Sequence, residues 1–201
     1  MNLPSKHLEE AVELFSSFPG IGIRTALRMV LNLLKRENDD LQKFGDVIQK
    51  IKFHVKSCEN CGNISDHDVC AVCSNPSRNA RLICVVEDIR DVMAIEATNT
   101  FQGMYHVLGG VISPMEGIGP SDLFINKLIE KCIDRKVDEV ILALSPTMEG
   151  DTTNFYLFKK LSQANIIITT LSRGIAVGTE IQYADEMTLS RSLKYRIPFQ
   201  S

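Results

Sequence analysis

The 201-residue sequence lacks the features that mark several common protein classes. No apolar run approaches the ~20 residues that a membrane-spanning helix needs. The first ten residues are polar and charged, without the apolar segment of a secretory signal. There is no internal repeat and no low-complexity tract, and 44% hydrophobic with 23% charged residues excludes a disordered chain. We therefore expect a cytoplasmic globular protein of one or two domains, with no membrane partner.

Signatures of common catalytic sites are missing as well. The four histidines are scattered and suggest no Ser-His-Asp or Cys-His triad. The glycine- and proline-rich segment at 108–120 has neither a Walker nor a dinucleotide-binding pattern, and it is expected to be a long shaped loop.

A net charge of −3 at first disfavours a nucleic-acid binder. The charge is uneven, however. Residues 1–57 carry nine Lys and Arg against seven Asp and Glu, whereas the rest of the chain carries 13 against 18. Residues 14–36 hold four positive side chains and no negative one. A basic segment is therefore present within an acidic chain.

Hydrophobic spacing divides the chain into a helical part and an α/β part. Apolar residues at three- and four-residue spacing predict three helices before residue 57. From residue 81 onward, predicted strands at 82–86, 104–108, 139–144 and 166–171 alternate with predicted helices at 88–97, 121–135 and 152–162. Such alternation is typical of βαβ units and a parallel sheet, so the fold class is α/β with a small helical module in front.

Four of the six cysteines form two Cys-x2-Cys pairs. They are Cys58, Cys61, Cys70 and Cys73. Each pair can form a tight knuckle, and four thiolates suit tetrahedral Zn²⁺ with no position open to water. We predict one structural zinc ion; a redox dithiol and four unrelated thiols are the alternatives. His67 lies between the pairs and is expected to be exposed, whereas Cys84 and Cys132 lie in apolar surroundings and are predicted to be inert core thiols.

Residues 18–24, Phe-Pro-Gly-Ile-Gly-Ile-Arg, connect two predicted helices and look like a helix-hairpin-helix motif. Backbone N–H groups at the start of the second helix can bind a phosphate without reading bases. The candidate DNA-binding residues are Gly20, Gly22, Arg24 and Arg28. A tight helical hairpin without a ligand is the alternative. Lys35 and Arg36 are expected to interact with the C-terminal helix dipole rather than with DNA.

Carboxylates follow two of the predicted strands. They are Glu87, Asp88 and Asp91 after the first strand, and Glu149 and Asp151 after the third. Because the carboxyl ends of parallel strands share one edge of a sheet, these groups could hold Mg²⁺ for phosphoryl chemistry. They could equally be solvated groups at the N-termini of the following helices.

In this order, the features resemble the RecR family of bacterial recombination mediators. The most specific stretches are PGIGIRTALRM, the cysteine spacing, LICVVEDIRDVMAIE, YHVLGGVISPMEGIGP, PTMEGDTT and YADEMTLSRSL. The resemblance implies a helix-hairpin-helix module at 1–57, a four-cysteine zinc finger at 58–73, a Toprim domain at 80–175 and a C-terminal oligomerisation segment at 176–201.

The resemblance also implies a function. Proteins of this family work with RecO and, at DNA junctions, with RecF, and they help RecA to displace single-strand binding protein from gapped DNA. They form dimers or ring tetramers that can encircle DNA, and no catalytic turnover is attributed to them. A nucleoid-associated bacterial protein is therefore expected. The family's basic hairpin residues correspond to Arg24 and Arg28, and the Toprim acidic residue, in a region associated with RecO contact, corresponds to Glu87.

Departures from the Toprim pattern favour binding over catalysis. Toprim enzymes carry Asp-x-Asp where this chain has Ser145 and Thr147, and hydroxyls are weak Mg²⁺ ligands. Ala176 stands where the family usually has Pro, which concerns only the local loop. We therefore expect a non-enzymatic mediator of DNA repair. The alternatives are a Mg²⁺-dependent Toprim nuclease or primase-like enzyme, and a protein adaptor that does not touch DNA.

Overall fold

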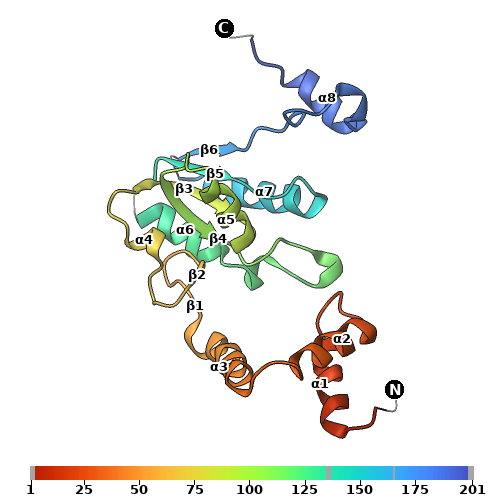
Figure 1. Ribbon diagram of the computed structural model, residues 1–201. Coiled ribbons are helices and arrows are strands. Elements are labelled where there is room, and N and C mark those ends of the chain that lie inside the picture. The colour runs from red at the N-terminus through yellow and green to blue at the C-terminus, as the bar shows by residue number, and fades with distance from the viewer. Residues whose placement is uncertain (1–2, 135–136, 165, 199–201) are drawn as a thin grey trace. The chain divides into compact units, whose positions relative to one another are not determined.

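The computed structural model describes residues 3–134, 137–164 and 166–198. The chain divides into two compact units, Met1–Val55 and Lys56–Ser201 (Figure 1). Among its described residues, the first unit contains three helices, α1 (Lys6–Ser16), α2 (Ile23–Leu33) and α3 (Asn38–His54). The second contains a small ribbon and a parallel sheet with its helices.

Helices α1 and α2 form the core of the first unit. Val12 on α1 packs with Ala26 and Val30 on α2, and all three are buried. The turn between the helices contains Gly20 at φ +79°, a conformation that a residue with a Cβ rarely adopts. In contrast, α3 has no buried residue. The apolar spacing therefore predicts α3 correctly, although its apolar side chains remain largely exposed.

The second unit is built on four parallel strands. These are β3 (Asn79–Val86), β4 (Gly103–Val107), β5 (Glu139–Leu142) and β6 (Ile167–Thr170), in the spatial order β4-β3-β5-β6. The connecting helices are α5 (Ile89–Ala97), α6 (Ile125–Asp134) and α7 (Met148–Leu161). The sequence prediction of a parallel α/β sheet is confirmed.

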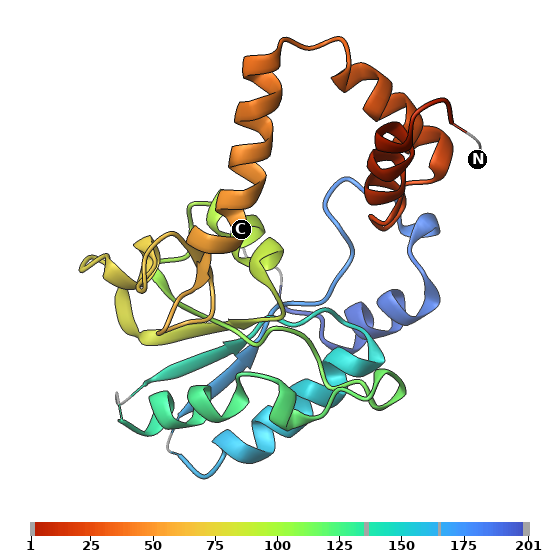
Figure 2. The same cartoon turned by 90° about the horizontal axis from the view of Figure 1, so that it is seen from below.

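Side-chain alternation along β3 divides the core between the two faces of the sheet. Ile83 and Val85 belong to the larger cluster, which includes residues of α6 and α7. Cys84 and Val86 belong to the cluster on the other face, which includes Val92 of α5. Figure 2 shows α6 and α7 together below the sheet and α5 above it. Because both faces are covered, β3 reads as a continuous apolar run rather than as an alternating one.

Two predicted helix starts differ from the structure. A separate 3₁₀ turn, η2 (Pro120–Asp122), precedes α6, and α6 begins at Ile125 rather than near residue 121. The side chain of Asp122 accepts a hydrogen bond from the Gly119 N–H at 2.8 Å, which closes this turn on itself. Helix α7 begins four residues before its predicted start, because the Thr147 hydroxyl accepts the Gly150 N–H at 3.0 Å and caps the helix.

The remaining elements flank the sheet in the sequence. The ribbon is β1 (Lys56–Ser57) paired antiparallel with β2 (Ile64–Ser65), and it is followed by the short helix α4 (Ala71–Ser74). Two further 3₁₀ turns are η1 (Pro114–Glu116) and η3 (Ile181–Tyr183), and the last helix is α8 (Glu186–Lys194). Within the described ranges, no helix combines the length and apolarity needed to cross a membrane.

Candidate functional site

The two cysteine pairs meet at one point. Each pair lies at a turn: the Cys58 carbonyl accepts the Gly62 N–H at 2.9 Å, and the Cys70 carbonyl accepts the Ser74 N–H at 3.0 Å. The β1–β2 ribbon brings the first turn back toward the second. As a result, the four sulfurs all lie within 4.8 Å of one another, including Cys73 at the end of the second pair.

The geometry of the sulfurs fits zinc. Tetrahedral coordination at ~2.3 Å places sulfurs about 3.8 Å apart, and the Cys61 and Cys70 sulfurs are separated by 3.6 Å. Three of the four cysteines are buried and Cys73 is half-buried. Burial opposes ionisation of Cys58, but backbone N–H donors, Cys70 foremost, outweigh it and lower the pKa of this thiol to about 7. The four cysteines thus form a zinc-finger cluster suited to one structural Zn²⁺, with no position left for substrate.

The zinc finger is attached to the sheet by main-chain contacts. The Cys61 carbonyl accepts the N–H of Val107 at the end of β4, at 2.7 Å. Gly62 has φ +76°, and a Cβ there would lie 2.9 Å from the Val107 carbonyl oxygen, so this position requires glycine. Next to this contact, the buried His106 ring bonds the Phe124 carbonyl at 2.8 Å. His67 is exposed, as predicted.

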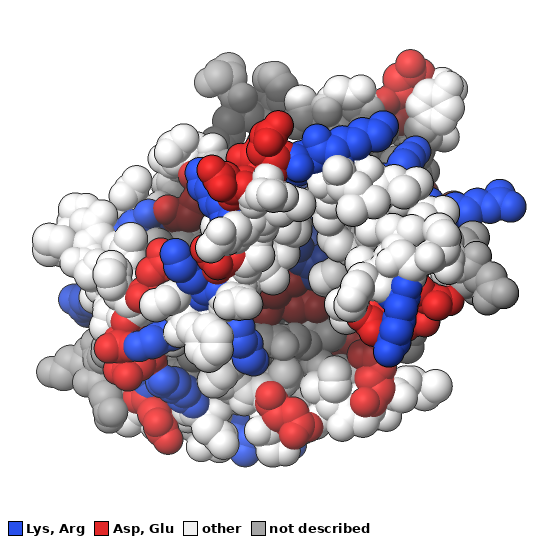
Figure 3. All heavy atoms as spheres, turned by 60° about the horizontal axis from the view of Figure 1, so that its bottom comes forward, with Lys and Arg blue, Asp and Glu red and all other residues white. Residues whose placement is uncertain are grey.

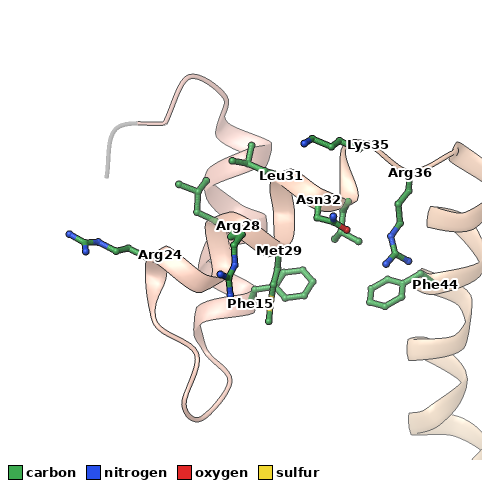
Figure 4. Close-up of a pocket in the computed structure, with 11 residues that line it drawn as sticks. Phe15, Arg24, Arg28, Met29, Leu31, Asn32, Lys35, Arg36 and Phe44 are labelled. Carbon is green, nitrogen blue, oxygen red and sulfur yellow. The ribbon is translucent and has the colours of Figure 1, made fainter.

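The backbone N–H groups at the start of α2 receive no side-chain cap. Gly22 caps the helix in an extended conformation, no side chain caps it, and its first turn contains no acidic residue. These features favour an anion at this helix end. Arg24 and Arg28 project from the same helix (Figure 4) and form no ion pair with any residue that the structure describes.

That Lys35 and Arg36 interact with the C-terminal dipole of α2 stays a prediction. Helix α2 ends at Leu33, and its last turn contains no basic residue. Both residues also line a cavity of 720 Å³ together with Arg24 and Arg28. The sequence analysis does not find this cavity, because the sequence does not show where α2 stops and turns toward α3.

The acidic residues after β3 serve mainly as helix caps. Asp88 accepts the Arg90 N–H at 2.7 Å, and Asp91 accepts the N–H groups of Glu87 and Asp88 at 3.1 and 3.2 Å. Asp88 also pairs with the Arg90 side chain, whose hydrogen bond lowers the pKa of this carboxyl. Burial, together with Asp91 and Asp88, raises the pKa of Glu87. The Glu87 carboxylate itself has no hydrogen-bond partner within the described part of the chain.

Of the two acidic residues in the first turn of α7, Glu149 and Asp151, the second forms ion pairs. Asp151 accepts hydrogen bonds from Arg173 at 2.6 and 3.2 Å and lies 3.5 Å from Arg191. The Arg173 bond is the main reason that the pKa of Asp151 is lowered. Sequence reasoning missed both arginines, because they lie 22 and 40 positions away and no motif links them to this helix. In the part of the chain that the structure describes, the four cysteines are the only group of three or more potential ligands brought together.

Known protein families match the chain along nearly its whole length. Their models match in consecutive segments: the RecR helix-hairpin-helix at residues 8–52, the RecR four-cysteine zinc finger domain at 55–75, the Toprim domain at 81–172 and the RecR C-terminal region at 174–197.

Three relatives named Recombination protein RecR match nearly end to end. The protein from Flavobacterium johnsoniae is 55% identical over 100% of this chain and 97% of its own length. The protein from Bacteroides thetaiotaomicron is 54% identical over 98% and 96%, and that from Cytophaga hutchinsonii is 52% identical over 100% and 98%. With the four-cysteine cluster, the α1–α2 hairpin and the parallel sheet in the same order, the chain belongs to the RecR family of recombination proteins.

Proposed function

We infer that the chain, as a member of the RecR family, has a role in recombinational DNA repair, in a family whose members are generally non-catalytic mediators. We propose that the chain binds DNA backbone through the α1–α2 hairpin and acts with RecO and RecF to load RecA onto gapped or single-stranded DNA. The helix-hairpin-helix holds the DNA, the zinc finger stabilises the start of the second unit, and the Toprim domain binds partner proteins.

The observation that carries the proposal is the uncapped start of α2 beside two arginines that pair with no described residue. The N–H groups at the start of the first turn have no partner within this helix, and the cap contributes no side-chain acceptor. A phosphate oxygen fits these donors, and Arg24 and Arg28 supply positive charge one turn apart. Positive and negative side chains are interspersed over the face in Figure 3. The proposed binding therefore depends on these local groups rather than on a general positive field.

The test compares two double variants with the same charge change. Arg24→Ala with Arg28→Ala removes the proposed contacts, and Lys50→Ala with Lys52→Ala removes two cations from α3. Binding of the full chain to gapped DNA is measured by fluorescence anisotropy over a range of salt concentrations. We expect the arginine variant to lose affinity and to reduce the log–log salt slope by ~1.4–1.8, since each phosphate contact contributes ~0.7–0.9. Equal behaviour of the two variants would disprove this DNA surface.

For the Toprim domain, the structure supports partner binding over Mg²⁺-dependent strand cleavage. Asp88 and Asp91 are engaged in helix capping and Asp151 in ion pairs, which leaves Glu87, among the described residues, as the unpartnered acid after β3. We propose that Glu87, with Glu149, meets a basic group on RecO. Glu87→Gln is expected to weaken RecO capture by the full chain while DNA binding without RecO is unchanged. Metal-dependent cleavage of gapped DNA that Glu87→Gln abolishes would contradict this assignment.

The last segment supports a homo-oligomer. Several apolar side chains on and after α8 are more than half exposed; they are Met187, Leu193, Tyr195 and Ile197. Exposed apolar side chains gathered on one short segment are typical of an interaction site. We propose that this segment joins copies of the chain, as a dimer or a ring tetramer, which would multiply weak backbone contacts by avidity.

A further inference from the structure

The 720 Å³ cavity of the first unit combines positive charge with aromatic surface. Its cations are Arg24 and Arg28 from α2 and Lys35 and Arg36 from the connection to α3. Its aromatic side chains are Phe15 of α1 and Phe44 of α3. The cavity therefore extends well beyond the hairpin turn that the motif marks.

The charge in this cavity is not neutralised within the first unit. No Asp or Glu lines it. None of its four cations forms an ion pair with a residue in the described ranges. The nearest acids in the sequence are Glu37, Asp39 and Asp40. Glu37 is the N-cap residue of α3, and the two aspartates lie in its first turn, where they complement the helix dipole. An occupant with repeated negative charge suits this lining better than a neutral or basic one.

Phe44 adds a second kind of recognition. Its side chain is 39% exposed although it is large and apolar. Figure 4 shows Arg36 extending from the α2–α3 connection toward the ring of Phe44, and both residues line the cavity. Cations that track a backbone beside rings that stack bases are the combination with which proteins bind single strands. A duplex does not offer base faces in this way.

We propose that this cavity binds single-stranded nucleic acid, with Lys35 and Arg36 on successive phosphates and a base stacked on Phe44. The inference rests on the proposed function, because it extends the same DNA-binding surface from Arg24 and Arg28 across to α3. It assigns to the first unit a preference for unpaired over paired strands.

The experiment uses the full chain with two fluorescent probes, a short oligothymidine and an abasic phosphate chain of the same length. The variants are Lys35→Ala with Arg36→Ala, and Phe44→Leu. The matched controls on α3 are Lys50→Ala with Lys52→Ala, and Phe53→Leu, which alters an exposed phenylalanine outside the cavity. Circular dichroism and light scattering verify that fold and oligomer mass are retained.

We expect the two classes of variant to separate on the two probes. Lys35→Ala with Arg36→Ala weakens binding to both and lowers the log–log salt slope by ~1.4, since single strands contribute ~0.7 per phosphate contact. Phe44→Leu weakens oligothymidine binding about five- to tenfold and leaves the abasic probe unaffected, because only a base can stack. Phe44→Tyr retains the ring and restores oligothymidine binding. The controls leave both probes unaffected.

Three results would overturn the inference. One is unchanged binding in both cavity variants, and another is an equal loss on both probes for Phe44→Leu. The third is a change in oligomer mass, which would show that a second copy of the chain occupies the cavity. When one of these results is obtained, Arg24→Ala with Arg28→Ala distinguishes the two proposals. If this variant loses binding, only the extension to α3 fails; if it binds normally, the proposed function fails as well.

Discussion

Replacing Glu96 by Gln tests the polar network that ties β3, α5 and β4 together. The Glu96 carboxylate on α5 accepts two hydrogen bonds from Arg78, just before β3, and one from the Tyr105 hydroxyl on β4 at 2.7 Å. Arg78 also donates to the carbonyls of Phe101 and Gly103, so its guanidinium remains fixed if the carboxylate is removed. The variant therefore leaves a buried cation without its counter-charge.

The expected loss of stability follows from burial. The Arg78 side chain is 11% exposed and that of Glu96 is 32% exposed. Removing one partner of a fully buried pair costs ~3–5 kcal/mol, and the solvent contact of Glu96 reduces this to about 2–3 kcal/mol. Asp138→Asn is the matched control. It breaks the Arg81–Asp138 pair, whose side chains are 62% and 56% exposed, and is expected to cost about 0–1 kcal/mol.

Tyrosine fluorescence provides the assay. The sequence has no tryptophan, and its four tyrosines all lie in the second unit, so their emission during urea unfolding reports on that unit alone. The hydrogen bond from Arg78 lowers the pKa of Glu96 in the folded chain below its unfolded value of ~4.3. The advantage of wild type over Glu96→Gln is thus complete above that value and declines as the pH falls through the folded pKa.

Zinc release at acidic pH affects wild type and variant alike, so the difference between them isolates Glu96. A loss no greater than that of Asp138→Asn, or a difference that stays constant as the pH falls below about 4, would refute the reasoning.

Three further predictions concern the second unit. Elemental analysis is expected to give one zinc per chain and to lose it in Cys70→Ser, with a lower melting temperature; full stability without metal would contradict a structural site. Gly150→Ala is expected to cost about 1–3 kcal/mol in urea unfolding, because a Cβ would lie 2.0 Å from the Ser145 carbonyl oxygen; a neutral effect would show that this contact relaxes freely. Burial raises the pKa of Cys84 to about 12 and that of Cys132 to about 11. A thiol reagent at about pH 8 is therefore expected to reach neither until the chain unfolds, and rapid labelling of either would count against this.

Much of the fold is encoded locally. The matched Cys-x2-Cys pairs indicated a four-thiolate site because thiolates at that spacing have few other uses, and the sulfurs do converge. Apolar residues at three- and four-residue spacing indicated the helices. The strands were indicated by short continuous apolar runs such as that of β3, because a strand buried on both faces is apolar at every position. Helix starts were less accurate: the serine at position 121 looked like a cap, whereas Asp122 closes a separate turn and α6 begins later.

The sequence by itself determined the family, the zinc ligands, the order of the parts and the basic hairpin, since each depends on residues close together in the chain. Only the tertiary structure decided how distant residues share their charges. Asp151 pairs with Arg173 and Arg191, which lie 22 and 40 positions away in the sequence. No local sequence pattern reveals ion pairs over such separations. Likewise, the end of α2 places Lys35 and Arg36 in a cavity with Phe44, because the direction of the chain after a helix depends on packing rather than on a local motif.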